Sequence, residues 1–190
     1  MIFAETNRLI LRALTREDLP RYTRLIGEWD VTQWLSRVPY PFTLKDAEKF
    51  LRHMEEGYRA DRPELFLIAN KASDAAMGGV GLHPSNTQER LPEEVEIGYW
   101  LGRAYWGQGY MSEAVAAVLA LAFRRPEIER VISTTDPANE ASQNVLRRAG
   151  LTYVGLRPRV GEALRGGVEV TRWELTRVVY ERNERRKGAL

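Results

Sequence analysis

The chain has 190 residues, of which 28 are basic and 26 acidic, so its formal net charge is only +2. The absence of cysteine excludes a disulfide framework, a cysteine-based zinc site and a cysteine nucleophile, and two histidines leave little for a metal centre. No run approaches the ~18 apolar residues of a membrane helix. Charged residues interrupt the N-terminal segment early, which argues against a signal peptide. We therefore expect a cytoplasmic protein without a membrane partner.

Apolar periodicity and turn residues predict the elements in chain order. A short strand at 8–12 precedes a helix capped by Thr15, and Thr43 caps a second helix. Strands follow at 65–70, 77–82 and 95–101, then a helix at 111–123, a strand at 130–135 and a helix at 139–149 that ends before Gly150. Two strands at 153–156 and 168–176 are expected to form a hairpin, and residues 181–190 a charged, frayed tail.

This order of elements predicts one domain over residues 1–180, with a mixed sheet and helices on both of its sides. The strands at 95–101 and 130–135 flank a helix, so they should run parallel with a right-handed crossover if they are neighbours. The basic residues are interspersed with carboxylates rather than clustered, which argues against a nucleic-acid partner.

A glycine pair, Gly107 and Gly109, lies between a predicted strand and the helix at 111–123. Glycines permit a tight turn and a close approach of a ligand to the backbone, and the free N–H groups at a helix start favour an anion such as phosphate. No Lys-Ser or Lys-Thr follows, so a P-loop is not indicated, and Ser112 stands where a dinucleotide-binding fingerprint needs a third glycine or alanine.

Four segments together carry a family resemblance: residues 6–12, 95–101, 105–110 and 139–142. In this order and spacing they resemble the GNAT N-acetyltransferases, and within them the branch of the ribosomal-protein acetyltransferases RimJ and RimL. The resemblance extends from about Glu5 to Thr176. It implies an α+β fold with a mixed, mostly antiparallel sheet, helices on both faces, and one splayed parallel strand pair into which acetyl-CoA inserts.

The resemblance also implies a cofactor site. Backbone groups of Trp100 and Leu101 would bind the pantetheine arm, and Asn139 would bind the pantetheine or its amide. The pyrophosphate would lie on a loop made of Trp106, Gly107, Gln108, Gly109, Tyr110 and Met111. One departure concerns Ala104, at a position where the family often has arginine or glutamine.

Acetyl transfer to an amine requires a base, because an aliphatic amine has a pKa near ~10 and arrives protonated. The resemblance assigns this role to Glu96. Glu96 could otherwise be an ordinary strand carboxylate paired with an arginine. Two further carboxylates, Glu93 and Glu94, are competitors that we expect instead to line an acidic mouth for cationic substrates.

Ser142 is expected to protonate the leaving sulfur. Its alternative is a first-turn serine that bonds only to its own backbone, and Tyr110 is a second candidate for the proton donor. Asn139 is also well placed to cap the helix. In the family, a loop carrying Trp29, Trp34, Tyr40 and Phe42 would border the acceptor pocket, although packing between helices explains these aromatic residues equally well. His83 is expected to be a loop histidine.

The predicted function is transfer of an acetyl group from acetyl-CoA to an amine, on a protein N-terminus or a small molecule, directly within a ternary complex. Two alternatives stay open: a non-catalytic sensor of acyl-CoA, and a ribosome-associated binding protein that uses the basic residues at 182–187. The sequence is compatible with a homodimer.

Overall fold

In the computed structural model, which describes residues 1–59, 65–84, 91–159 and 167–188, the strands form one eight-stranded sheet in the order β1-β2-β3-β4-β5-β6-β8-β7. Among the strands of the described residues, β5 and β6 alone pair in parallel, and all other neighbours are antiparallel. The expected mixed, mostly antiparallel sheet is therefore confirmed. The strands are β1 (Ile2–Glu5), β2 (Leu9–Arg12), β3 (Leu65–Asn70), β4 (Ala76–Pro84), β5 (Glu94–Leu101), β6 (Arg130–Thr135), β7 (Thr152–Pro158) and β8 (Glu169–Thr176).

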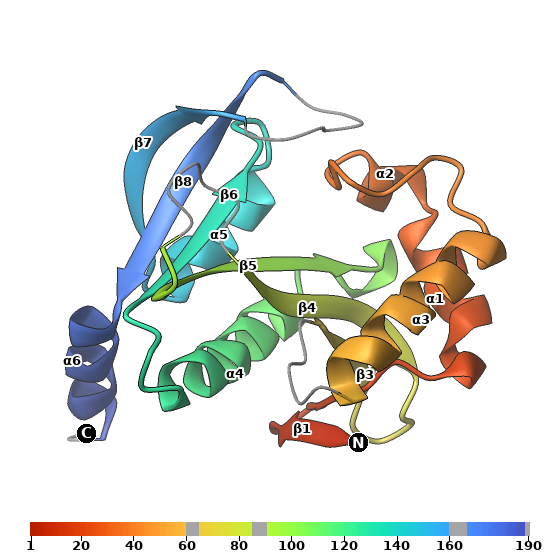
Figure 1. Cartoon of the computed structure of the whole chain (residues 1–190), viewed down its shortest axis with the longest axis horizontal. Coiled ribbons are helices and arrows are strands. Elements are labelled where there is room, and N and C mark those ends of the chain that lie inside the picture. Colours follow the sequence, from red (N-terminus) through yellow and green to blue (C-terminus); the bar gives the residue numbers. More distant parts are fainter. Residues whose placement is uncertain (60–64, 85–90, 160–166, 189–190) are drawn as a thin grey trace.

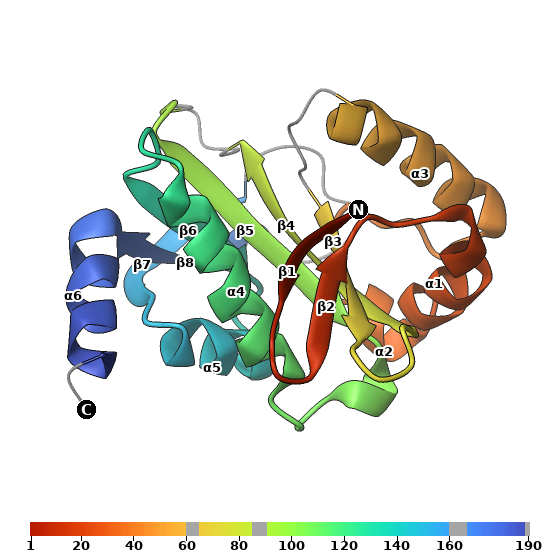
Figure 2. The ribbon, with the colours of Figure 1, turned by 90° about the horizontal axis from the view of Figure 1, so that it is seen from below.

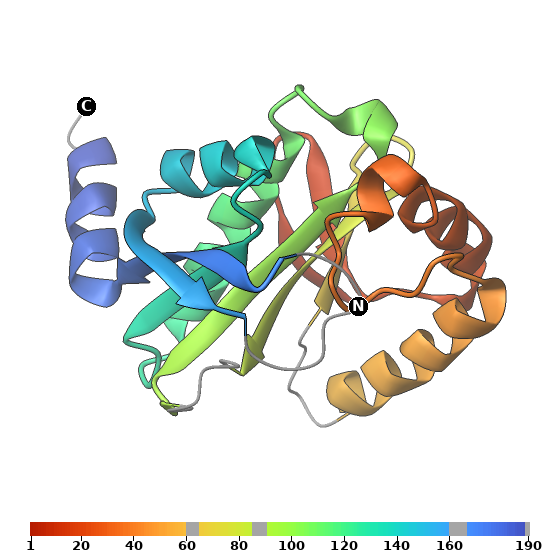
Figure 3. The same cartoon turned by 90° about the horizontal axis from the view of Figure 1, so that it is seen from above.

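Helices cover both faces of this sheet (Figure 1). Helix α4 crosses one face beside the β1–β2 hairpin (Figure 2), whereas α1, α2 and α3 gather on the other side (Figure 3). Among the described residues, no helix has the length and apolar character needed to cross a membrane. The helices are α1 (Leu19–Ile26), α2 (Trp29–Thr32), α3 (Leu44–Arg59), α4 (Tyr110–Arg124), α5 (Glu140–Arg148) and α6 (Arg177–Lys187).

Two hydrophobic clusters, one on each face, explain why helices are needed on both sides. In β3, Phe66 and Ile68 belong to the cluster under α4, whereas Leu67 belongs to the cluster under α1 and α3. Successive side chains of a strand point to opposite faces, so a run that is apolar at every position must be covered by other elements on both faces of the sheet. The uninterrupted apolar run of β3 thus specifies a central strand.

The parallel pair β5–β6 separates after only three paired residues. The register joins Glu94 to Arg130, Val95 to Val131 and Glu96 to Ile132, and no further pair follows. At the point of divergence, the buried side chain of Ser133 donates from Oγ to the carbonyl oxygen of Ile97 at 2.9 Å. The Ser133 hydroxyl therefore satisfies the Ile97 carbonyl, which continued pairing of the two strands would otherwise satisfy. The strands can thus diverge from this point (Figure 1).

Three elements differ from the sequence prediction. Neither β1 nor α2 was expected. The expected frayed tail is instead helix α6 up to Lys187, while residues 189–190 lie outside the described residues. Helix α6 is anchored by contacts with distant residues: Tyr180 stacks on Phe123 at 4.6 Å between ring centroids, and Arg177 Nη1 donates to the Phe123 carbonyl at 2.9 Å.

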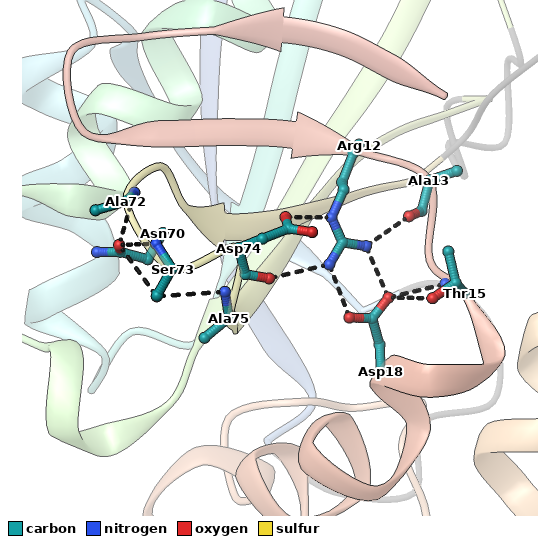
Figure 4. A network of polar contacts seen from close by, with 9 residues as sticks. All are labelled: Arg12, Ala13, Thr15, Asp18, Asn70, Ala72, Ser73, Asp74 and Ala75. Carbon is teal, nitrogen blue, oxygen red and sulfur yellow. Dashed lines mark hydrogen bonds and ion pairs between the residues drawn. The ribbon is translucent and has the colours of Figure 1, made fainter.

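A half-buried arginine joins β2 to its neighbours (Figure 4). Arg12 donates from Nη1 and Nη2 to the two carboxylate oxygens of Asp18, at 2.7 and 2.8 Å, and from Nε to Asp74 Oδ1 at 2.7 Å. Asp18 precedes α1, and Asp74 lies in the turn between β3 and β4. Burial acts to raise the pKa of Asp18, but the hydrogen bonds from Arg12 and Thr15 hold that pKa below its usual value.

Candidate active site

A cavity of about 1220 Å³ opens where β5 and β6 diverge. Its walls come from β5, β6, the glycine loop before α4, the start of α5 and the paired ends of β7 and β8. Of the residues predicted to form the site, all except Gln108 line this cavity: Glu96, Trp100, Leu101, Trp106, Gly107, Gly109, Tyr110, Met111, Asn139 and Ser142. Segments far apart in the sequence therefore meet around one space.

The glycine loop has the backbone geometry of an anion site. Gly107 and Gly109 have φ values of 73° and 80°, in the left-handed region that favours glycine, and Gly109 is the N-cap of α4. The first helical hydrogen bond is donated by Glu113 N to the Gly109 carbonyl at 3.1 Å. The N–H groups of residues 110–112 precede that bond, so they are available to a ligand.

The end of β5 leads directly into this loop. Trp106 folds back and donates from Nε1 to the Leu101 carbonyl at 2.6 Å. The Trp100 ring packs edge-on against Tyr22 in the opposite core, with ring centroids 5.0 Å apart. Trp100 can therefore serve a ligand mainly through its backbone, as the family resemblance implies.

Glu96 occupies the β5 side of the divergence point. Glu96 is in register with Ile132 of β6 and with His83 of β4, and His83 also lines the cavity. The Thr134 hydroxyl donates to Glu96 Oε1 at 2.6 Å and so fixes the orientation of the carboxylate. Within the described residues, no arginine forms an ion pair with Glu96, which disfavours the simple strand ion pair as its role.

The expectation that His83 belongs to a loop is wrong, because it lies in β4.

The neighbouring Glu94 also lines the cavity, as expected, but its charge is already paired. Only 2% of its surface is exposed, and its Oε2 lies 2.8 Å from Arg172 Nη2 and 3.8 Å from Arg130 Nη1. Arg172 also pairs with Glu174 at 2.8 Å. These charges compensate one another, so Glu94 joins β5 to β8 and adds little free negative charge to the cavity wall.

Ser142 lies across the cavity, at the start of α5, in contact with a residue that the sequence pattern did not single out. Its Oγ is 3.0 Å from the Tyr99 hydroxyl, which also donates to the Ser142 carbonyl at 3.1 Å. Burial raises the pKa of Tyr99, and the hydrogen bond with Ser142 offsets only part of that shift. The Tyr99 phenol therefore keeps its proton at neutral pH.

Asn139 fulfils the expected capping role. Its Oδ1 accepts from Ser142 N at 3.0 Å, which closes the first turn of α5 and leaves the amide nitrogen of Asn139 as a further donor. Of the aromatic residues expected near the acceptor, only Trp34 lines the cavity among the described residues. Trp29 and Tyr40 pack on each other at 4.9 Å, and Phe42 packs on Tyr22 at 6.3 Å.

This arrangement can bind an anion-bearing cofactor and support proton transfer, and comparison with known proteins identifies the cofactor. The acetyltransferase (GNAT) domain model matches residues 8–152. An uncharacterized N-acetyltransferase of Bacillus licheniformis is 26% identical over 151 residues, covering 80% of this chain and 83% of that protein. The uncharacterized protein YkkB of Bacillus subtilis is 25% identical over 178 residues, covering 93% of each.

The fold also matches solved structures. RimL, a ribosomal-protein alpha-N acetyltransferase in complex with coenzyme A, superposes with a TM-score of 0.73 at 21% identity, over 93% of this chain and 98% of RimL. This likeness concerns the fold, and it confirms the expected RimL-like architecture. Because the family model covers well over half of its length, the chain belongs to the GNAT family and is an N-acetyltransferase that uses acetyl-CoA.

Proposed function

We propose that this enzyme acetylates a primary amine, on a protein N-terminus or a small molecule, by direct transfer within a ternary complex. One observation carries the proposal: a single cavity is lined by a carboxylate, a pair of hydroxyl groups and a glycine loop at a helix start. These are the groups that deprotonation, thiolate protonation and cofactor binding require.

Acetyl-CoA would be held mainly by backbone groups. The N–H groups at the start of α4 receive the pyrophosphate, with the helix dipole favouring its charge. The strand end at Trp100 and Leu101 binds the pantetheine arm. Asn139 uses only its carbonyl oxygen for capping, so its amide nitrogen can donate to a pantetheine carbonyl.

Glu96 takes the proton from the incoming ammonium group, directly or through a water molecule. The neutral amine then attacks the thioester carbon, and a backbone N–H stabilises the charge that develops on the carbonyl oxygen. As the new C–N bond forms and the C–S bond breaks, the nitrogen releases its second proton to water, which leaves a neutral amide, and CoA departs as a thiolate. Ser142 donates a proton to that thiolate, and the protonated Tyr99 beside it can restore the proton.

The functional test is a panel of amines and N-terminal peptides incubated with acetyl-CoA, with the release of free CoA thiol as the readout. Turnover is expected with at least one amine. Binding of acetyl-CoA without turnover on any acceptor would instead support a non-catalytic sensor of acyl-CoA.

The assignment of the base makes a sharper prediction. Glu96→Gln keeps an oxygen that can accept the bond from Thr134, so the site should retain its geometry while it loses its proton acceptor. We expect kcat to fall by about tenfold or more with the Kd for CoA unchanged. Glu93→Gln is the matched control, since Glu93 does not line the cavity and should leave kcat unaltered. An unchanged kcat for Glu96→Gln at neutral pH would remove Glu96 from the mechanism.

A further inference from the structure

The segment 6–12 contains an arginine that reaches the glycine loop from about a hundred residues away in the sequence. Arg8 donates to the Glu113 carboxylate twice, from its backbone N at 2.9 Å and from Nε at 2.7 Å, and its Nη2 forms an ion pair with Glu113 Oε2 at 2.7 Å. Thr6 adds a third donor, from Oγ1 at 2.5 Å. We call these three residues, Thr6, Arg8 and Glu113, the Arg8 clamp. It fastens the β1–β2 turn to the first turn of α4, two segments that lie side by side in Figure 2.

The same guanidinium also holds the backbone of the loop itself. Arg8 Nη1 donates to the Gln108 carbonyl at 3.0 Å, and the guanidinium carbon lies 4.4 Å above the Tyr110 ring. A trans peptide is planar, so its C=O and the following N–H point in opposite directions. With the Gln108 carbonyl fixed toward Arg8, the N–H of Gly109 is directed away from Arg8. A residue outside the cavity thus sets the orientation of a loop N–H group.

The clamp has an electrostatic consequence as well. Glu113 lies in the first turn of α4, where a free carboxylate would repel a diphosphate bound at the helix start. Burial acts to raise the pKa of Glu113, but the hydrogen bonds from Thr6 and Arg8 hold it below its usual value, so the group is charged. Arg8 compensates this charge at 2.7 Å. Ala104, three residues before Gly107, offers no cation, so Arg8 is the residue that compensates Glu113.

We propose that Arg8 is a positioning residue for the cofactor: through the Arg8 clamp and the Gln108 carbonyl it pre-organises the glycine loop for the pyrophosphate of CoA. The proposal rests on the proposed role of this loop. Arg8 is suited to this task because its planar fork holds the Glu113 carboxylate and the Gln108 carbonyl at the same time, which a lysine ammonium cannot reproduce.

The test compares two ligands, CoA and pantetheine, of which only CoA carries the pyrophosphate. Their Kd values are measured by calorimetry for the wild type, Arg8→Met, Arg8→Lys and Arg12→Met. Arg12 is the matched control, because it lies in the same segment and forms a comparable ion-pair network remote from the loop. We expect Arg8→Met to weaken CoA binding by about fivefold or more while pantetheine binding stays unchanged.

Arg8→Lys should bind CoA almost as weakly as Arg8→Met does, because lysine restores the positive charge but not the planar guanidinium group. Arg12→Met should lower Tm and alter neither Kd. Equal weakening of both ligands by Arg8→Met, or full recovery in Arg8→Lys, would overturn the positioning role. Unchanged CoA binding in Arg8→Met, with a loss in Gly109→Val, would overturn the Arg8 inference and leave the loop assignment standing. If wild type bound CoA no tighter than pantetheine and Gly109→Val had no effect, the loop assignment itself would fail.

Discussion

Ser142 makes a polar contact through each of its backbone groups and through its hydroxyl, and two of these contacts are with Tyr99. The Tyr99 hydroxyl lies 3.0 Å from Ser142 Oγ and 3.1 Å from the Ser142 carbonyl oxygen. A phenol has a single proton to donate, so at any moment it serves one of the two acceptors. When Tyr99 donates to Ser142 Oγ, the serine proton is free to face the sulfur of CoA. The two hydroxyls should therefore act as a coupled proton-donating pair.

Coupling predicts that substitutions of the two residues are not additive. Ser142→Ala should lower kcat by about tenfold or more, because the thiolate would leave without a proton. Tyr99→Phe alone should cause a smaller fall, and in the Ser142→Ala background it should change kcat little further. Steady-state kinetics of the four proteins at saturating acetyl-CoA measure this cycle. Independent effects that multiply in the double variant would show that the pair is not coupled.

Residue-level prediction from the sequence succeeded where the partner is local. Asn139 lies three residues before Ser142, a spacing that by itself indicates a helix cap, and the structure confirms the bond. By contrast, Glu94 pairs with Arg172, 78 residues later, and Thr134 donates to Glu96 across 38 residues. No local spacing encodes such contacts, because they depend on which strands become neighbours. This is why the sequence analysis placed Glu94 at the cavity but missed its pairing with Arg172, and missed the polar contacts of Tyr99.

At the scale of elements, Arg12 joins β2, the start of α1 and the β3–β4 turn through two carboxylates of different exposure (Figure 4). The Asp18 side chain is 9% exposed, whereas that of Asp74 is 62% exposed. Solvent screens the outer pair, so most of the stabilisation should come from Asp18. Since the pKa of Asp18 is lowered in the folded state, its contribution is complete above the usual aspartate pKa and is lost as the pH falls through the folded-state value.

We therefore expect Asp18→Asn to lower the free energy of unfolding by about 2 kcal/mol at pH 7. The difference from wild type should shrink as the pH falls below about 4. Urea unfolding monitored by circular dichroism between pH 3 and pH 7 measures both effects. Asp74→Asn is the matched control and should show a smaller loss. A deficit for Asp18→Asn that stayed constant over this pH range would contradict the charged pair as its cause.

The bounds of an element could be predicted from the sequence where a single local pattern marks them. The bounds of β3 and β6 were predicted to the residue, since each is a short apolar or β-branched run bounded by polar residues. The glycine loop was likewise visible, because positive φ at Gly107 and Gly109 requires that residue type. Helix α6 has no continuous apolar stripe and is held by Tyr180 and Arg177 against distant residues, so its helical state depends on tertiary contacts.

For the molecule as a whole, the cavity connects folding to cofactor binding. Its walls combine the splayed strands, the glycine loop and α5, so an unfolded chain offers no comparable site. A ligand that binds only the folded state stabilises it by mass action, by about 2.7 kcal/mol at a concentration of 100 times Kd. For a chain of this size, 1 kcal/mol corresponds to roughly 2–4 °C in Tm. CoA at that concentration should therefore raise Tm by about 5–10 °C.

Substitutions at two glycines with similar backbone geometry can distinguish an effect on CoA binding from an effect on the stability of the free protein. Gly109 (φ 80°) lines the cavity, whereas Gly150 (φ 90°) ends α5 and does not line it. Valine is strained at either position, so Gly109→Val and Gly150→Val should both lower the Tm of the free protein. Only Gly109→Val should also lose most of the rise in Tm with CoA, because its loop N–H groups would be displaced. Differential scanning calorimetry with and without CoA measures both quantities, and a full rise in Gly109→Val would exclude this loop from cofactor binding.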